Sequence, residues 1–97
     1  MAFIQIMEYT TKDENEVEAL GREWEQATEG TRTARRAIVG RDRAHPERFC
    51  SIVFFDSYED AMVNSALPET QAFAEKLTTV ISGTPTFRDL DVVEDRT

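Results

Sequence analysis

Residues 48–61, RFCSIVFFDSYEDA, contain the most apolar segment of the chain and run from it directly into helix-favouring sequence. In a strand over Arg48–Asp56, alternate side chains point to opposite faces. Apolar groups then lie on both faces, one set at Cys50, Ile52 and Phe54 and the other at Phe49, Val53 and Phe55. Such a strand is stable only when both of its faces are covered, which indicates a central place in a sheet.

Three more strands and two helical regions are expected around this segment. The strands are predicted over Phe3–Tyr9, Thr33–Arg43 and Thr86–Glu94, and the middle two strands of the chain are joined by a hairpin loop at 44–47. A capping-box pattern at Thr11–Glu14 opens the first helix, which Gly30 ends. The chain therefore reads strand, helix, strand, strand, helix, strand.

The second helical region begins with Ser57 as the expected N-cap and is interrupted by Pro68. The residue before a proline avoids helical geometry, so two short helices are predicted to meet near Ser65–Leu67. The second piece is expected to bury Phe73, Leu77 and its following apolar residues, and to stop at Ser82–Pro85.

A four-stranded sheet with helices on one side would leave an apolar face in water, and this predicts a homodimer through the open face. We expect the partner subunit to cover the strand face that carries Phe3, Met7, Phe49, Val53 and Phe55.

Length and composition limit the class of protein. The 97 residues form one expected domain, 1–97, with 40% apolar residues and no apolar run of the roughly 20 residues that a membrane span requires. The chain enters a strand at Phe3, so no signal peptide is expected and a cytoplasmic location is predicted. The single cysteine, Cys50, is expected to be an inert thiol in the core of a reduced protein.

The formal charge of −8 argues against nucleic-acid binding, which needs clustered cations. Five arginines nevertheless fall between residues 31 and 43, and strand alternation divides them between two faces. A solvated edge or an interface rim is favoured over an anion site. The carboxylates of the first helix are scattered without histidine, so they are interpreted as a solvated face and no metal site is expected.

The order of elements, the length and several segments together carry a family resemblance. These segments are FIQIMEY at 3–9, SIVFFDSYEDA at 51–61, PETQAFAEKL at 68–77 and the last strand. The whole chain resembles the dimeric α+β barrel superfamily, and within it the antibiotic-biosynthesis monooxygenase group. The resemblance implies an α+β, ferredoxin-like subunit with a four-stranded antiparallel sheet, helices on one face, and a barrel formed by two copies.

Haem-degrading members of this superfamily would carry a histidine ligand in the second helical region, and residues 58–81 contain none. The only histidine, His45, lies in the hairpin loop, where solvent exposure is expected. The resemblance therefore favours the members without cofactor, for which no haem, flavin or metal is expected. Such an oxygenase needs an apolar pocket, a partner for a phenol and donors for developing negative charge.

Six polar or aromatic residues could build such a site. Asn64, Tyr58 and Arg88 are the candidates for catalysis, and Trp24, Gln5 and Tyr9 are the candidates for ligand binding. Each also has a structural interpretation. Trp24 lies on the apolar stripe of a helix, Tyr58 and Asn64 can pack and cap, Gln5 can bond across a dimer, and Arg88 can pair with Asp89 or Asp91.

Three functions remain open from the sequence. The protein could be a cofactor-independent monooxygenase or related enzyme acting on an aromatic or polyketide-like small molecule. It could be a non-catalytic binder of a similar molecule, or a structural homodimeric domain. A polar-lined pocket beside the helices favours the first two, and side chains that fill that space favour the third.

Overall fold

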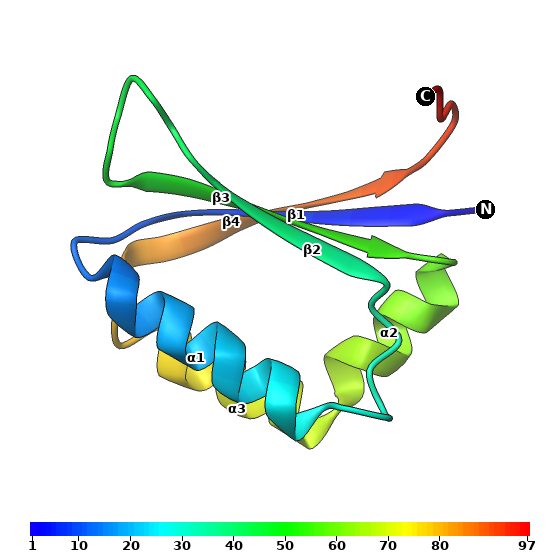
Figure 1. Ribbon diagram of the computed structural model, residues 1–97, viewed down its shortest axis with the longest axis horizontal. Coiled ribbons are helices and arrows are strands. Elements are labelled where there is room, and N and C mark those ends of the chain that lie inside the picture. The colour runs from blue at the N-terminus through cyan, green and yellow to red at the C-terminus, as the bar shows by residue number, and fades with distance from the viewer.

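The computed structural model describes residues 1–97. Its elements are β1 (Phe3–Thr10), α1 (Glu14–Ala27), β2 (Arg36–Arg41), β3 (Arg48–Phe55), α2 (Tyr58–Ala66), α3 (Pro68–Leu77) and β4 (Ser82–Asp91). The strands form one antiparallel sheet in the order β2-β3-β1-β4, and all three helices lie on the same side of it (Figure 1). The predicted α+β, ferredoxin-like architecture is confirmed.

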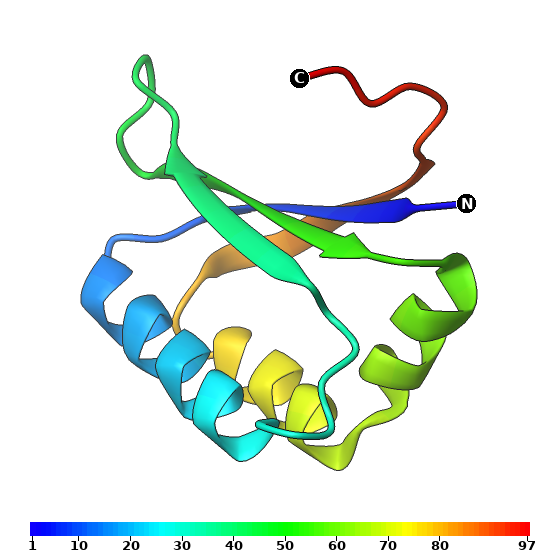
Figure 2. The same cartoon turned by 45° about the vertical axis from the view of Figure 1, so that its right-hand side comes forward.

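The helices do not cover the sheet evenly. α1 and α3 lie side by side and pack on each other, whereas α2 contacts β1 and β3 directly at the other end of the sheet (Figure 2). The sheet therefore meets the helical layer mainly through α2.

Two strands, β2 and β4, differ from their predicted ranges at both ends. β2 begins at Arg36 instead of Thr33 and ends at Arg41, before the predicted Arg43. β4 begins at Ser82, because Ser82 pairs with Thr10 beyond an irregularity in the β1–β4 ladder, and it ends at Asp91 instead of Glu94. Long-range pairing fixes these ends, and local sequence carries little information about it.

Helix starts follow the sequence at α2 but not at α1. Ser57 caps α2, and its Oγ accepts a hydrogen bond from the Asp60 amide at 3.1 Å. The capping box expected at the start of α1 is wrong, because Asp13 is the N-cap residue and makes no side-chain capping bond. Thr11 instead donates its hydroxyl to the Val80 carbonyl at 2.6 Å, which ties the start of α1 to the end of α3.

The predicted break before Pro68 is confirmed. Leu67 has ψ of 134°, an extended conformation, and is both the C-cap of α2 and the N-cap of α3. Pro68 occupies the first turn of α3, where its missing N–H leaves no intrahelical bond unmade. Gly30 has φ of 87°, in the left-handed region that glycine adopts without steric cost, and it lies just beyond α1.

The strand register assigns each side chain to one of two faces. Phe3 pairs with Phe55 and Tyr9 with Phe49, and the ring of Phe3 contacts Tyr58 of α2. We call this the helix-side face. The opposite, open face carries apolar side chains from all four strands: Ile4, Ile6, Ile38, Ile52, Phe54 and Leu90.

The face expected to meet a second copy was therefore identified wrongly. Phe3, Met7, Phe49, Val53 and Phe55 all lie on the helix-side face, where Phe3 and Phe55 pack against Ala61 of α2. Both faces of β1 and β3 are apolar, so periodicity alone could not decide which of them the helices cover.

The small core at α2 yields a stability prediction. Phe55 is 3% exposed and contacts Phe3, with a ring separation of 6.4 Å. We expect Phe55→Ala to lower the free energy of unfolding by about 3 kcal/mol, because it removes a buried ring and leaves a cavity. Chemical denaturation measures the change. Val93→Ala, at a residue that is 85% exposed, is the control and should shift stability by less than about 0.5 kcal/mol.

Candidate functional site

Asn64 is the most unusual polar residue on the helix-side of the protein. It lies on α2 one turn after Ala61, which is fully buried against the sheet, so both side chains share the face of α2 directed at the strands. Asn64 is 6% exposed, and its Oδ1 atom is buried without a hydrogen-bond partner. An unsatisfied buried acceptor costs about 1–3 kcal/mol, so Asn64 Oδ1 is a polar atom whose burial packing alone does not account for.

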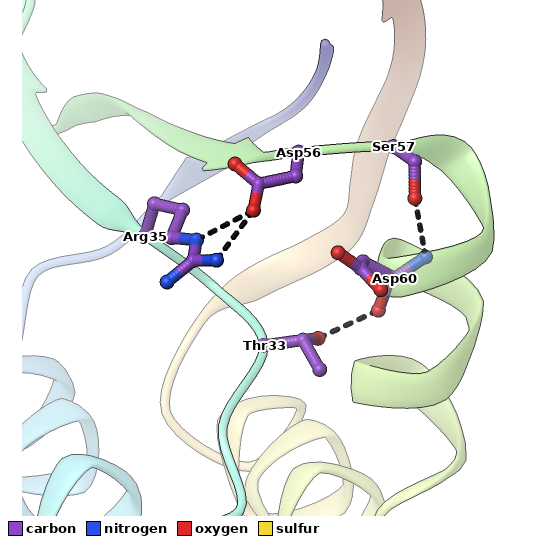
Figure 3. Close-up of polar contacts among 5 residues, drawn as sticks. All are labelled: Thr33, Arg35, Asp56, Ser57 and Asp60. Carbon is purple, nitrogen blue, oxygen red and sulfur yellow. Dashed lines mark hydrogen bonds and ion pairs between the residues drawn. The ribbon is translucent and has the colours of Figure 1, made fainter. Parts of the chain in front are cut away.

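A polar network holds the start of α2 and thereby places Asn64. The Arg35 guanidinium donates to Asp56 Oδ2 at 2.8 and 2.5 Å, and the Thr33 hydroxyl donates to the Asp60 carbonyl at 2.6 Å (Figure 3). With the Ser57 cap, these bonds connect the segment before β2 to the first turn of α2 (Figure 3). The helix that carries Asn64 is thus fixed from both neighbouring strands.

Tyr58 and Gln5 lie on the same side of the sheet as Asn64. Tyr58 begins α2, is half-exposed, and sets its ring edge-on to Phe3 at 5.5 Å. Gln5 lies on β1 and donates from Nε2 to Asp89 of β4 at 3.3 Å. The Gln5 amide is therefore already engaged within the subunit and does not await a partner copy.

Trp24 lies between α1 and α3. Its Nε1 donates to the Thr70 hydroxyl at 2.8 Å, its ring packs on Phe73 at 6.5 Å, and the Arg32 guanidinium lies 5.5 Å from the ring centre. The indole donor is thus used internally. Thr70 is a partner that sequence analysis missed, since nothing local links a threonine on one helix to a tryptophan on another.

Tyr9 is buried at the end of the sheet near the start of α1. Its ring stacks on Phe49 with a centroid separation of 5.7 Å and an interplanar angle of 13°. Burial raises the pKa of the Tyr9 phenol, and the nearby Glu14 and Cys50 raise it further. Tyr9 is therefore held as a neutral phenol, which suits packing or hydrogen-bond donation and opposes use as a base.

Arg88 is separated from the other candidates. It pairs in register with Ile6 on the open face and donates to Glu8 at 2.5 Å, whereas Gln5 and Asp89 bond on the helix-side face. Asp89 and Asp91 were the expected partners of Arg88, and the structure pairs it with Glu8 instead. The structure does not bring Arg88 together with Asn64, Tyr58 or Trp24.

The outer strands keep apolar side chains accessible on the helix-side face. Val39 of β2 is 59% exposed and Phe87 of β4 is 57% exposed, although both share this face with Met7. α2, which carries Asn64, covers only the end of the central strands. Val39 and Phe87 are therefore left as accessible apolar surface beside it. Neither residue stood out in the sequence, where each is an ordinary strand position.

Neither of the two best-defined cavities is the aromatic pocket expected between sheet and helices. The first, beside Trp24 between α1 and α3, holds about 110 Å³, below the roughly 300 Å³ at which ligand pockets begin. The second holds about 370 Å³ at the hairpin end of the open face. Its lining is Glu8, Gly40, Arg41, Asp42, Arg48, Phe49 and Cys50.

No group of three or more His, Cys, Asp or Glu side chains lies close enough together to bind a metal ion. His45 is exposed in the hairpin loop, with Nδ1 3.7 Å from Asp42. The backbone amides of Ala44 and His45 donate to Asp42 Oδ1 and lower the pKa of this carboxyl group. The Asp42 carboxylate therefore stabilises the hairpin loop. No helix combines the length and the apolar character that crossing a bilayer requires.

The raised pKa of Tyr9 gives a prediction for alkaline solution. The folded state holds the phenolic proton more tightly than the unfolded chain, so this contribution to stability is complete below about pH 10 and is lost as pH rises through the folded pKa. Absorbance at 295 nm, compared between wild type and Tyr9→Phe, should show Tyr9 ionising above pH 10. Ionisation of Tyr9 at or below pH 10 would contradict the buried placement.

Comparisons with known proteins identify the fold. No protein-family model matches the chain, and no curated protein matches it in sequence. Among solved structures, SnoaB, a cofactor-independent oxygenase from Streptomyces nogalater crystallised as a variant with an asparagine replaced by alanine, superposes with a TM-score of 0.82 at 13% identity, covering 97% of this chain and 95% of SnoaB.

Two further structures cover nearly the whole chain. An antibiotic biosynthesis monooxygenase-like protein from Caulobacter crescentus gives a TM-score of 0.83 at 11% identity, covering 96% of this chain and 91% of that one. Rv0793 from Mycobacterium tuberculosis gives 0.82 at 8% identity and covers all of both chains. Several of the similar structures are described as antibiotic biosynthesis monooxygenases. The chain therefore has the same ferredoxin-like fold as these antibiotic-biosynthesis monooxygenase-like structures.

Proposed function

We propose that this protein is a homodimeric, cofactor-independent oxygenase of an electron-rich aromatic or polyketide-like small molecule. The observation that carries the proposal is the buried Oδ1 of Asn64, which has no partner within the chain. Its helix is fixed to the sheet, and the apolar side chains of Val39 and Phe87 remain accessible on the face below. The ligand is proposed to lie between this face and the helices.

Asn64 has the right chemistry to orient a hydroxylated aromatic. Its amide oxygen accepts a hydrogen bond from a phenol, and its amide nitrogen donates to a developing oxyanion. Tyr58 stands at the start of the same helix and is half-exposed, so we propose it as the second polar contact. We propose that the ends of the site are formed by Gln5, Tyr9 and Trp24. The fluorescence of Trp24 then reports ligand binding.

The reaction needs no cofactor, because the substrate itself is the reductant. For an anthrone, the methylene carbon loses two hydrogens and gains one oxygen atom of O₂, which gives the quinone, while the other oxygen atom leaves as water. The protein is proposed to favour the enolate form that reacts with oxygen, to exclude water and to stabilise negative charge. The similarity to SnoaB, whose description is a cofactor-independent oxygenase, supports this reaction class.

The open face supports the homodimer. The chain exposes 6856 Å², whereas a folded monomer of its 11.1 kDa mass would expose about 5,700 Å². Part of the excess is apolar, since Ile38 and Leu90 on the open face are both well exposed. A second copy laid on this face would close the two sheets into an eight-stranded barrel whose interior such side chains fill. We propose a cytoplasmic location for this dimer, consistent with one unpaired thiol at Cys50.

A non-catalytic binder is the second candidate, and one observation favours it. Arg88, the expected cationic partner for developing charge, lies on the open face and pairs with Glu8. Arg88 therefore supplies no cationic contact to the proposed site. A binder would use the same Asn64 contact to hold its ligand without turnover.

Oxygen consumption distinguishes the two candidates. Purified protein is mixed with an anthrone in air-saturated, metal-chelated buffer without flavin or haem, and oxygen uptake is followed with an electrode. The proposal predicts protein-dependent uptake of one O₂ per quinone formed. Quenching of Trp24 fluorescence by the same compound without oxygen uptake would establish a binder and exclude the oxygenase.

Asn64 variants separate function from stability. Asn64→Leu, of similar shape, should slow turnover by about a hundredfold while leaving the free energy of unfolding unchanged or about 1 kcal/mol higher, because it removes an unsatisfied buried acceptor. Ser65→Ala, at the exposed neighbouring residue, is the control and should change neither property. Loss of stability together with unchanged turnover would show that Asn64 only packs.

The dimer is tested on the corrected face. Ile52→Asp places a charge in the centre of the open face and should convert the dimer to a monomer, since burying an unpaired carboxylate costs several kcal/mol, about 3 or more. Sedimentation velocity reports the two masses. Val93→Asp, in the exposed C-terminal segment, should remain dimeric. Wild-type protein that is monomeric at 100 μM would rule out the dimer.

A further inference from the structure

The proposed oxygenation begins with the loss of a proton from the substrate, so the site needs a group that accepts one. The side chains discussed so far do not supply it. The Tyr9 phenol is held in its neutral form, and the amide of Asn64 is not basic. Glu8 and Cys50, which pair in register, both lie on the open face, and Glu8 is already paired with Arg88 there.

The strand register leaves two carboxylates on the helix-side face of the sheet. Asp89 of β4 pairs with Gln5 and Asp91 with Phe3, so both aspartates lie on this face, and both are exposed. Phe87 lies on the same face two residues before Asp89 and is 57% exposed. Asp89 is therefore the carboxylate next to an accessible aromatic ring on which a flat ligand can pack.

The carboxylate of Asp89 is held through one oxygen only. Gln5 Nε2 donates to Asp89 Oδ1 at 3.3 Å, and Asp89 Oδ2 accepts no hydrogen bond within the chain. Asp89 also makes no ion pair, because the neighbouring Arg88 lies on the opposite face and pairs with Glu8. A carboxylate accepts hydrogen bonds and does not donate them, so Oδ2 is an oriented acceptor without a partner.

A row of paired residues connects Asp89 with the helix that carries Asn64. Val53, Gln5 and Asp89 lie side by side on β3, β1 and β4. At the β3 end of this row, Val53 packs against the core that contains Ala61 of α2. Neighbouring strands lie roughly 4.8 Å apart, so the backbones of Val53 and Asp89 are separated by about 10 Å. A three-ring aromatic molecule is long enough to extend from α2 to Asp89 over this row.

We propose that Asp89 is the general base of the oxygenase and accepts the substrate proton on its Oδ2 atom. The inference rests on the proposed function and adds the proton acceptor that the reaction needs. With an anthrone, Asp89 takes one proton from the methylene carbon, and the electron pair of that C–H bond becomes the enolate. The neutral ligand becomes an anion while the carboxylate becomes a neutral acid, so the net charge of the site does not change.

The same carboxyl group completes the proton balance. The enolate reduces O₂ and forms a C–O bond to it, and the Asp89 acid returns its proton to the outer oxygen, which gives a hydroperoxide. Asp89 then accepts the second proton of the carbon as the C=O bond forms and the O–O bond breaks. The departing hydroxide takes this proton and leaves as water, so one anthrone and one O₂ give one quinone and one water.

Replacement of Asp89 and rescue with an added base test the assignment. Asp89→Ala should lower kcat for oxygen uptake with an anthrone by about a hundredfold or more, the usual contribution of a general base. Quenching of Trp24 fluorescence by the same anthrone under anaerobic conditions should be unchanged, because the loss lies in proton transfer and not in binding. Since Asp89 is exposed, acetate can reach the vacated position, and added acetate should restore turnover in proportion to its concentration.

Asp91→Ala is the matched control. It removes the same charge from the same face of β4, and it should keep wild-type turnover and show no response to acetate. Circular dichroism verifies that both variants fold. Wild-type turnover in Asp89→Ala, or a loss of turnover that acetate does not restore, would overturn the assignment of the base while leaving the oxygenase intact. A wild-type protein that binds the anthrone without consuming oxygen would overturn both the oxygenase and its base.

Discussion

The structure depends on one constraint: the central strands β1 and β3 are apolar on both faces, while the helices cover only one. Phe3 and Phe55 pack against Ala61 of α2 and form the small buried core of the subunit. On the other side, four of the five isoleucines of the chain, Ile4, Ile6, Ile38 and Ile52, share the open face. Apolar burial is the dominant favourable contribution to folding, so a chain of this size gains most by covering the second face with another molecule.

The same constraint assigns separate roles to the two faces. The helix-side face is covered well at α2 but leaves Val39 and Phe87 accessible near the outer strands, and it is the face toward which Asn64 is directed. The open face has no helix (Figure 1) and carries the Glu8–Arg88 pair and Arg36 among its apolar side chains. We therefore propose that a ligand binds on the helix side and a second copy on the open side, where Arg88 lies.

Much of the fold could be predicted from the sequence because local signals agree with it. The alternation in β3, the Ser57 cap and the break before Pro68 each have a local physical cause, and the structure confirms all three. The face that the helices cover could not be predicted, because the adjacent residues Phe54 and Phe55 are equally apolar and lie on opposite faces. Strand ends such as Ser82 depend on pairing with a distant residue, here Thr10, which local sequence does not encode.

The candidate site was predictable only residue by residue. Polar groups on apolar elements marked Asn64 and Gln5, and the structure places both on the helix side. The hydrogen-bond partners of the candidate residues could not be predicted from the sequence. Trp24 donates to Thr70 and Gln5 donates to Asp89, and both partners are distant in the sequence. The unpaired state of Asn64 Oδ1 could not be predicted from the sequence, because it depends on every hydrogen bond formed around α2.

Nuclear magnetic resonance can test the division of roles between the two faces in one titration. A redox-inactive anthraquinone is added to protein labelled at isoleucine methyl groups and at side-chain amides. The account predicts saturable shifts of the Asn64 amide resonances, with the methyl resonances of Ile4, Ile6, Ile38 and Ile52 unmoved because a second copy covers them. Saturable shifts confined to those isoleucines, with Asn64 unchanged, would place the ligand on the open face and contradict the account.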